Sequence, residues 1–153
     1  MKVNSILLGD LSENTYVEIV QNTIYNIGYI CPKCAYLKRK LTFVHKNPNI
    51  FSRINFKVIL KEKAKLDLEI LLRIDKGAVN TDTFLNVRAM LLRDDTYIRI
   101  IPSLEIHESE VKAGHGATIS YIDELQSYYL KTRGLNMKQV ENLLVSAFLQ
   151  FEE

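Results

Sequence analysis

Two short segments decide the fold of this 153-residue chain: LKEKAKLDL at residues 60–68 and LRDDTYIRI at residues 92–100. They lie 32 positions apart, and in both a leucine is followed by a polar corner and then by apolar residues that alternate with polar ones. Alternation of this kind is typical of β-strands, and a repeat of about this length is typical of stacked structural units. Short strands with tight corners would also fit a β-sandwich, but the repeat favours stacked β coils.

The same alternation extends over most of the chain. It appears at residues 56–60, 66–70 and 98–106, with polar corners at residues 61–65, 75–77 and 93–96. No helical pattern long enough to form a crossover interrupts these runs. We therefore predict that residues 1–122 form one mainly β domain.

A different period begins after Ile122. Residues 123–133 contain no helix breaker and end at Gly134, a residue suited to the left-handed position that closes a helix. Asn136 and Gln139 have the spacing of a capping pair, so a second helix should follow, and residues 123–153 should form a C-terminal helical segment. The apolar residues of this second helix share one face, which predicts packing on the β domain or on a partner: Val140, Leu143, Leu144, Ala147, Phe148 and Phe151.

Composition restricts the class of protein. The chain has 47% hydrophobic and 25% charged residues, with 6 Gly, 3 Pro and 2 Cys, which excludes a disordered, collagen-like or disulfide-scaffold protein. No stretch approaches the roughly 20 apolar residues that cross a bilayer, and the apolar run at residues 6–8 is too short for a signal-peptide core. We predict a cytoplasmic protein with no membrane segment.

The net charge is only +2, but the basic and acidic residues are unevenly distributed along the chain. Residues 33–65 contain ten Lys and Arg residues against the single acid Glu62, whereas residues 66–153 contain nine basic and fourteen acidic residues. A basic stripe can bind phosphates or an acidic partner, but few aromatic residues interleave with this one. We favour a solvated strand face and keep nucleic-acid binding as a minor alternative, which predicts an affinity that falls steeply with salt.

The motif from Cys31 to Cys34 is the main candidate for metal or redox chemistry. A Cys-x-x-Cys turn can direct two thiolates at one ion, but tetrahedral zinc needs four ligands. Three possibilities stay open: His45 and another group complete the site, two chains share the ion, or the thiols are plain apolar groups. His45 has no carboxylate or second histidine nearby in the sequence, so we expect a surface position for it.

Sequence signatures of catalysis are absent. The chain contains no serine nucleophile elbow, no phosphate-binding glycine loop and no His-Glu-x-x-His motif. We predict that the protein is not an enzyme.

The region from Pro102 to Leu135 carries the most specific motif of the chain. It reads PSLEI, then VKAGHGAT, then ID, and finally YYLKTRG. It resembles the C-terminal part of the SufB/SufD family of iron–sulfur cluster assembly scaffolds, whose pattern runs PxLEI, DVxCxHGAT, ID and FYLxSRGI. The resemblance extends from about residue 80 to residue 151, and residues 1–55 have no counterpart in it. The residues that match at the family spacing are Pro102, Leu104, Glu105, Ile106, Val111, His115, Gly116, Ala117, Thr118, Ile122, Asp123, Tyr129, Leu130, Arg133 and Gly134.

This resemblance implies a short right-handed parallel β-helix with two C-terminal α-helices. It also implies a non-catalytic, SufD-like scaffold, much shortened relative to the family, that dimerises with itself or with a longer SufB/SufD-type subunit. In that family the C-terminal helices bind the ABC ATPase SufC, which makes Tyr128, Tyr129 and Arg133 the docking candidates. A transient iron–sulfur cluster, or a metal at Cys31 and Cys34, is the cofactor that such a role would involve.

His115 matches the family's histidine, which lies near the dimer interface and can ligate iron. A packing histidine at the β-to-helix corner is the alternative. The motif's cysteine is Ala113 here, and the SufB positions for a sulfur-accepting cysteine and a glutamate ligand are Thr96 and Gly116. The thiolate chemistry of SufB is therefore not expected at these positions.

These departures leave a rival interpretation open, in which the chain is a structural or regulatory interaction module that kept the ATPase docking and lost the cluster chemistry. If the chain does handle sulfur or iron, Cys31 and Cys34 must supply the thiols, together with His115 or His45 of a second chain.

Three small residues are predicted to have structural roles. A tight junction between the β domain and the first helix needs backbone freedom and small side chains. We therefore expect Gly116, Ala117 and Gly134 at corners or caps.

Overall fold

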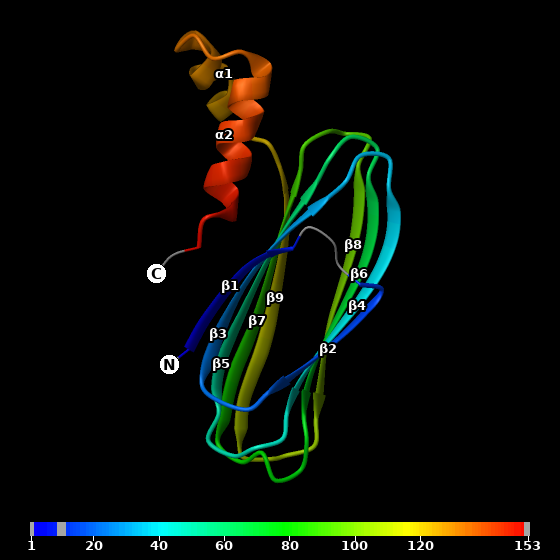
Figure 1. Ribbon diagram of the computed structural model, residues 1–153, viewed down its shortest axis with the longest axis vertical. Helices are drawn as coiled ribbons and strands as arrows, with labels where there is room; N and C mark the ends of the chain where they lie inside the picture. Colours follow the sequence, from blue (N-terminus) through cyan, green and yellow to red (C-terminus); the bar gives the residue numbers. More distant parts are fainter. Residues whose placement is uncertain (1, 9–11, 152–153) are drawn as a thin grey trace.

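The computed structural model describes residues 2–8 and 12–151, which form two parallel β-sheets and a pair of helices (Figure 1). Sheet A contains, in spatial order, β1 (Lys2–Leu8), β3 (Thr23–Cys31), β5 (Phe51–Leu60), β7 (Thr81–Leu91) and β9 (Val111–Tyr121). Sheet B contains β2 (Asn14–Ile19), β4 (Tyr36–His45), β6 (Lys65–Ile74) and β8 (Tyr97–Ile106). Consecutive strands alternate between the sheets, so the chain winds into a β-solenoid of about four coils.

The sequence repeat corresponds to one coil of the solenoid. Lys65 pairs in parallel register with Tyr97, 32 residues further along the chain. The Leu92 amide donates to the Leu60 carbonyl at 3.1 Å, and the Tyr97 amide donates to the Ala64 carbonyl at 3.0 Å. The two segments therefore lie one above the other, and the prediction of stacked β coils followed by two helices is confirmed.

The core lies between the two sheets and follows from the period-2 alternation. Every second residue of β6 is fully buried, from Leu66 to Ile74, and Ile54, Phe56 and Val58 of β5 are equally buried. Each side chain of this size stabilises the fold by about 1.5–3 kcal/mol when it leaves water. Inward-facing residues of neighbouring coils stack in register, so the core is one continuous column along the solenoid.

The corners of the solenoid use a left-handed backbone. Cys34 and Lys63, in successive coils, have φ values of 55° and 57°. Asn49 and Asn80, at the opposite corners, have φ values of 60° and 57°, and Asn80 Nδ2 donates to Asn49 Oδ1 at 3.1 Å. Asparagine tolerates this conformation better than most residues, which explains its recurrence at these corners.

The predicted caps of the two helices are observed, whereas α2 ends at Leu149, before Phe151 of the predicted apolar face. In α1 (Glu124–Thr132) the Asp123 side chain accepts from the first backbone amides, and Gly134 follows the helix with a φ of 91°. In α2 (Met137–Leu149) Asn136 and Gln139 form a reciprocal capping box. These caps satisfy amides that have no partner within the helix.

The apolar face of α2 is only partly covered by the solenoid. Val140 is fully buried, whereas Leu143 remains 47% exposed. An ion pair of 2.8 Å between Arg93 and Glu141 also joins α2 to the body. The helix pair therefore projects from one end of the sheets, as Figure 1 shows, and leaves apolar surface open.

No helix within residues 2–8 and 12–151 is long and apolar enough to cross a membrane. The prediction about a signal peptide concerns residues 1–10, of which residues 1, 9 and 10 lie outside the described part of the chain.

The core arrangement can be tested with two phenylalanines of sheet A. Phe56→Ala removes a fully buried ring and should lower the free energy of unfolding by about 3–5 kcal/mol because it leaves a cavity. Phe84→Ala is the matched control, since this ring lies on the outer face and is 42% exposed, and it should cost about 1 kcal/mol or less. Urea denaturation measures both losses, and equal losses would contradict a core between the sheets.

Candidate functional site at the open end of the solenoid

His115 lies on β9, the last strand of the solenoid. It is on the same face as the inward-pointing residues of the neighbouring strand β7. It pairs in register with Leu85 of β7, and Ala117 pairs with Val87. Leu85 and Val87 are fully buried, whereas His115 is exposed, because no described strand pairs with the outer edge of β9. The imidazole therefore sits where the interior column of the solenoid opens to the outside.

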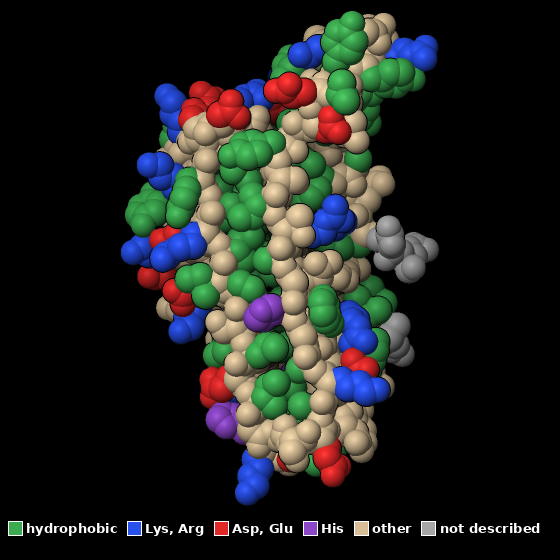
Figure 2. Space-filling view, turned by 180° about the vertical axis from the view of Figure 1, so that it is seen from behind, with side chains coloured by type: hydrophobic (Ala, Val, Ile, Leu, Met, Phe, Trp, Pro, Cys, Tyr) green, Lys and Arg blue, Asp and Glu red, His purple; other side chains and the backbone are tan. Residues whose placement is uncertain are grey.

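The same end of the solenoid exposes large apolar side chains. Ile106 of β8 is 44% exposed, and Ile119 and Tyr121 of β9 are 48% and 56% exposed. In register they continue the columns of buried residues in β6 and β7. Figure 2 shows hydrophobic side chains gathered in a band along this face, between ridges of backbone. We call Ile106, His115, Ile119 and Tyr121 the end-coil surface.

Gly116 and Ala117 do not lie at a corner, so their predicted role is corrected. Both are in the middle of β9, five or four residues before its end at Tyr121. On the outer face of this strand the neighbouring Gly114 makes room for the Phe84 ring, because a Cβ atom at Gly114 would lie 3.0 Å from that ring. A Cβ atom at Gly116 would only reach ordinary contact with the same ring, at 3.8 Å, so the close approach concerns Gly114. Gly134 is a cap, as the left-handed φ shows.

Cys31 and Cys34 point in different directions. Cys31 ends β3 and is fully buried in the inward column above Leu60, whereas Cys34 is exposed at the left-handed corner. Burial raises the pKa of the Cys31 thiol to about 11, and the positive charge of Arg39 offsets this only in part. Of the two thiols, Cys34 is therefore the one that reagents in solution can reach, and the two sulfur atoms do not share one surface.

The four candidate metal ligands, Cys31, Cys34, His45 and His115, do not lie close together within one chain. His45 lies at the far end of the ten-residue strand β4, about 30 Å along the strand from the cysteine corner. His115 is in the middle of β9, on another coil. Among the described residues, no group of three or more His, Cys, Asp or Glu side chains could hold a metal ion. Within the described part of the chain, these four side chains therefore do not form one metal site.

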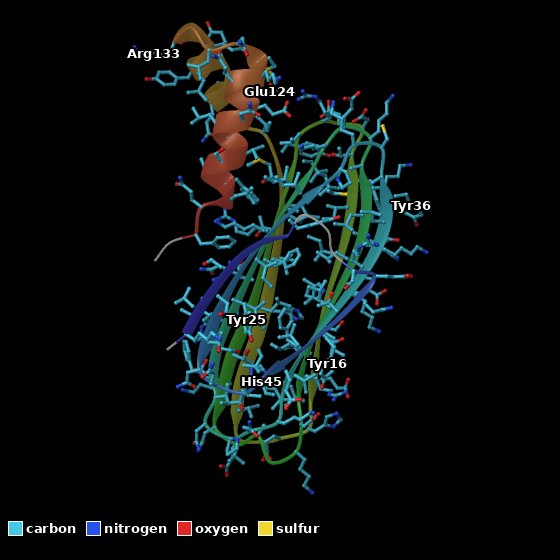
Figure 3. The ribbon with its side chains drawn as sticks, in the orientation of Figure 1. Tyr16, Tyr25, Tyr36, His45, Glu124 and Arg133 are labelled. Carbon is cyan, nitrogen blue, oxygen red and sulfur yellow. The ribbon has the colours of Figure 1, made fainter. Side chains whose placement is uncertain are left out.

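The expectation of a surface position for His45 is wrong. Its side chain is fully buried between the sheets (Figure 3), and its Nε2 atom lies 2.9 Å from Ser52 Oγ. Ser52 Oγ in turn lies 2.6 Å from Thr83 Oγ1, which makes a buried polar chain across two coils. Burial lowers the pKa of His45 to about 4, against a smaller opposite effect of the Arg73 backbone. His45 is therefore neutral near pH 7.

No sequence motif identifies Ser52 and Thr83, although their polar side chains stand out within the apolar alternation. They occupy equivalent inward positions of successive coils, and each interrupts an otherwise apolar alternation. Hydroxyl groups at such positions need a buried partner, and His45 supplies one.

The basic residues of the 33–65 stripe are divided between surfaces. Lys38, Lys40 and Lys65 lie on the outer face of sheet B, whereas Arg53 and Lys57 lie on the outer face of sheet A. Several of them bind acids, at distances of 2.7 Å for Lys46 with Glu18, 3.1 Å for Lys33 with Glu62 and 2.8 Å for Arg53 with Asp82. The stripe is therefore not one continuous surface for a nucleic acid.

The docking candidates form an exposed surface on α1. Tyr128 and Tyr129 are 68% and 55% exposed, and Leu125 is 79% exposed. The Arg133 guanidinium donates to the Tyr129 hydroxyl at 3.0 Å and lies over its ring, on the helix pair away from the sheets (Figure 3). Tyr129 is thus a surface residue, and these side chains are available to a partner.

Comparison with known protein families covers most of the chain. The family model described as "SUF system FeS cluster assembly, SufBD core domain" matches residues 11–148. This match includes most of residues 1–55, for which the motif comparison finds no counterpart, and it covers α1 and nearly all of α2.

Curated relatives carry the same description. The iron-sulfur cluster assembly protein SufD of Escherichia coli (strain K12) is 31% identical over 97 residues, which are 63% of this chain and 23% of the relative. SufD of Bacillus subtilis (strain 168) is 30% identical over 91 residues, or 60% of this chain and 21% of the relative. SufD of Plasmodium falciparum (isolate 3D7) is 25% identical over 155 residues, or 97% of this chain and 10% of the relative. The chain spans less than a quarter of the length of each.

The burial of His45 predicts a specific acid sensitivity. Its pKa is about 4 in the folded chain and about 6.5 in the unfolded chain, so the unfolded state binds the proton first. The contribution of neutral His45 to the free energy of unfolding is fully present above pH 6.5. It should fall by about 3 kcal/mol as the pH drops from 6.5 to 4. His45→Gln should remove this part of the pH dependence in urea denaturation, whereas His107→Gln, at an exposed histidine, should retain it. Identical pH profiles for His45→Gln and the wild type would disprove the assignment.

The two thiols should react at very different rates. Native protein treated with iodoacetamide at pH 7.5 should take up one label at Cys34, because Cys31 is buried and its pKa is about 11. Labelling of Cys31 should be at least about 100-fold slower until the chain is unfolded. Mass spectrometry of peptides measures both rates, with Cys34→Ser as the control that loses the fast label. Rapid labelling of both thiols would show that Cys31 is accessible.

Proposed function

This chain belongs to the SufBD family of iron–sulfur cluster assembly proteins, and on that basis we propose that it is a SufD-like, non-catalytic scaffold subunit of the cytoplasm that docks a SufC-type ATPase. The observation that carries the proposal is His115 on the exposed, otherwise apolar end-coil surface. An imidazole is a good ligand for iron, and an apolar surround strengthens its interaction with a charged ion.

The end-coil surface is the proposed dimer interface. Exposed apolar rows and unpaired strand edges favour association, since both are costly in water. The edge of β9 and the side chains of Ile106, Ile119 and Tyr121 offer both features. The partner is a second copy or a longer SufB/SufD-type subunit whose own solenoid end covers this one.

A shared cluster site follows from the composition of the end-coil surface. Ala113 and His115 lie two residues apart on the same face of β9, and Ala113 stands where the family motif has a cysteine. This chain therefore contributes the imidazole, and the partner contributes the thiolates that iron and sulfide require. The iron–sulfur cluster is the cargo of the assembly.

The helix pair is the proposed docking site for the ATPase. A nine-residue helix such as α1 is not stable alone, and of its side chains only Ser127 is buried. Leu125, Tyr128 and Tyr129 together form an exposed apolar patch that a partner would cover.

A docking module without cluster chemistry is the second candidate. It is favoured by Ala113, because this substitution leaves the end-coil surface without a thiol of its own. The two candidates share the ATPase contact and differ in whether iron and sulfide are bound.

Anaerobic co-expression with a SufC-type ATPase and a SufB-type subunit from the native host tests the proposal. The tagged chain should retain both partners together with iron and labile sulfide. His115→Ala should lower the bound iron and sulfide by about tenfold while the ATPase is retained, because His115 lies in the middle of β9 and the docking candidates lie on the separate helix α1.

The docking surface is tested by the double variant Leu125→Ala, Tyr128→Ala. It should weaken ATPase binding by about tenfold or more, as truncation of exposed aromatic anchors does at interfaces. Tyr16→Ala, at an exposed tyrosine of β2, is the control. If the unaltered chain retains the ATPase without metal, the docking module is favoured. If the double variant still retains the ATPase, docking through α1 is contradicted.

A further inference from the structure

The outer face of sheet A carries a ladder of asparagines. Asn26, Asn55 and Asn86 occupy equivalent positions on β3, β5 and β7, and Asn55 Nδ2 donates to Asn26 Oδ1 at 2.9 Å. Two residues further along the strands, Lys57 and Arg88 are register partners on the same face. Amide groups and two cations thus lie side by side on neighbouring strands.

The end of α2 covers this part of the sheet and forms a groove with it. A cavity of about 450 Å³ lies between them, with a polar floor of Asn55, Asn86, Lys57 and Arg88. Its opposite wall is formed by Phe148 and Phe151 together with their neighbours Ala147 and Gln150. These walls come from segments about 60 residues or more apart in the sequence, so the groove exists only in the folded chain.

The positions of the cations are held by the end of α2. The Lys57 ammonium donates to the Gln150 carbonyl and lies 4.5 Å from the centre of the Phe151 ring. The Arg88 guanidinium lies 5.5 Å from the centre of the Phe148 ring. These cation–π contacts orient both groups.

The groove favours an anion. Like charges on directly opposed strand positions repel each other, so an anion placed between Lys57 and Arg88 would relieve this repulsion. Arg53, Arg73, Arg93 and Arg99 each form an ion pair with a carboxylate. No acidic side chain in residues 2–8 and 12–151 forms such a pair with Arg88.

We propose that this groove binds a phosphoryl group, carried by a small molecule of about mononucleotide size. A guanidinium binds two phosphate oxygens at once, and an ammonium beside it adds a second positive charge. Asn55 and Asn86 offer donors and acceptors to the remainder of the ligand. The volume lies within the usual range of small-molecule sites and exceeds the need of a bare phosphate ion. The inference does not depend on the role in cluster assembly.

Isothermal titration with AMP, inorganic phosphate and adenosine tests the phosphoryl requirement. AMP should bind with a Kd below about 1 mM, and adenosine should bind at least about tenfold more weakly. Tighter binding of AMP than of inorganic phosphate would identify a phosphate ester as the source, and equal binding would identify the free ion. Binding of adenosine as tight as that of AMP, or no binding of either AMP or phosphate at about 1 mM, would overturn the proposal.

Variants of Arg88 test the location. Arg88→Gln should weaken AMP binding by about tenfold, and Arg88→Lys should weaken it less, because it keeps the charge and loses the planar fork. Arg99→Gln is the matched control, since it removes an arginine from the outer face of sheet B. Circular dichroism and thermal unfolding verify the fold of each variant, which is expected to persist because Arg88 is exposed. Unchanged binding to folded Arg88→Gln would overturn the proposal.

Discussion

Each strand of the solenoid hydrogen-bonds in parallel to the strand one coil away, so an inward residue in one coil lies directly above an inward residue in the next. This register stacks apolar side chains into continuous columns, and most of the stability of the fold comes from their burial. The apolar side chains at the end of a column are shielded from water only where a further coil covers them. No described strand covers the last coil, and for this reason the imidazole and the apolar surface proposed for partner binding meet there, around His115.

The polar chain of His45, Ser52 and Thr83 lies within these apolar columns. A buried polar group that lacks its partner costs about 1–3 kcal/mol, so each of the three groups depends on the others. The chain therefore favours the observed register over one shifted by a residue, which would separate the partners and turn the apolar columns outward. The same burial keeps His45 neutral and ties the stability of the fold to pH.

The outer surfaces, the end coil and the helix pair have separate tasks in this arrangement. His115 lies on the last coil of the solenoid, whereas α1 and α2 project from the ends of the strands and expose Tyr128 and Leu125. The proposed scaffold role requires this division, since the proposed cargo site and the proposed ATPase contact must be accessible at the same time. Where α2 returns to the sheet, Phe148 and Phe151 contact Arg88 and Lys57 and create the groove on sheet A.

The sequence alone determined the local features, namely the 32-residue coil repeat, the helix caps at Asn136 and Gly134, and the family motif around His115. These depend on neighbours in the chain or on a regular period. Only the tertiary structure decided that His45 is buried, that Cys31 and Cys34 diverge, that the basic stripe is split, and that Arg88 meets Phe148. The physical reason is that alternation assigns a side chain to one of two faces, whereas its burial and partners depend on which distant segment covers that face.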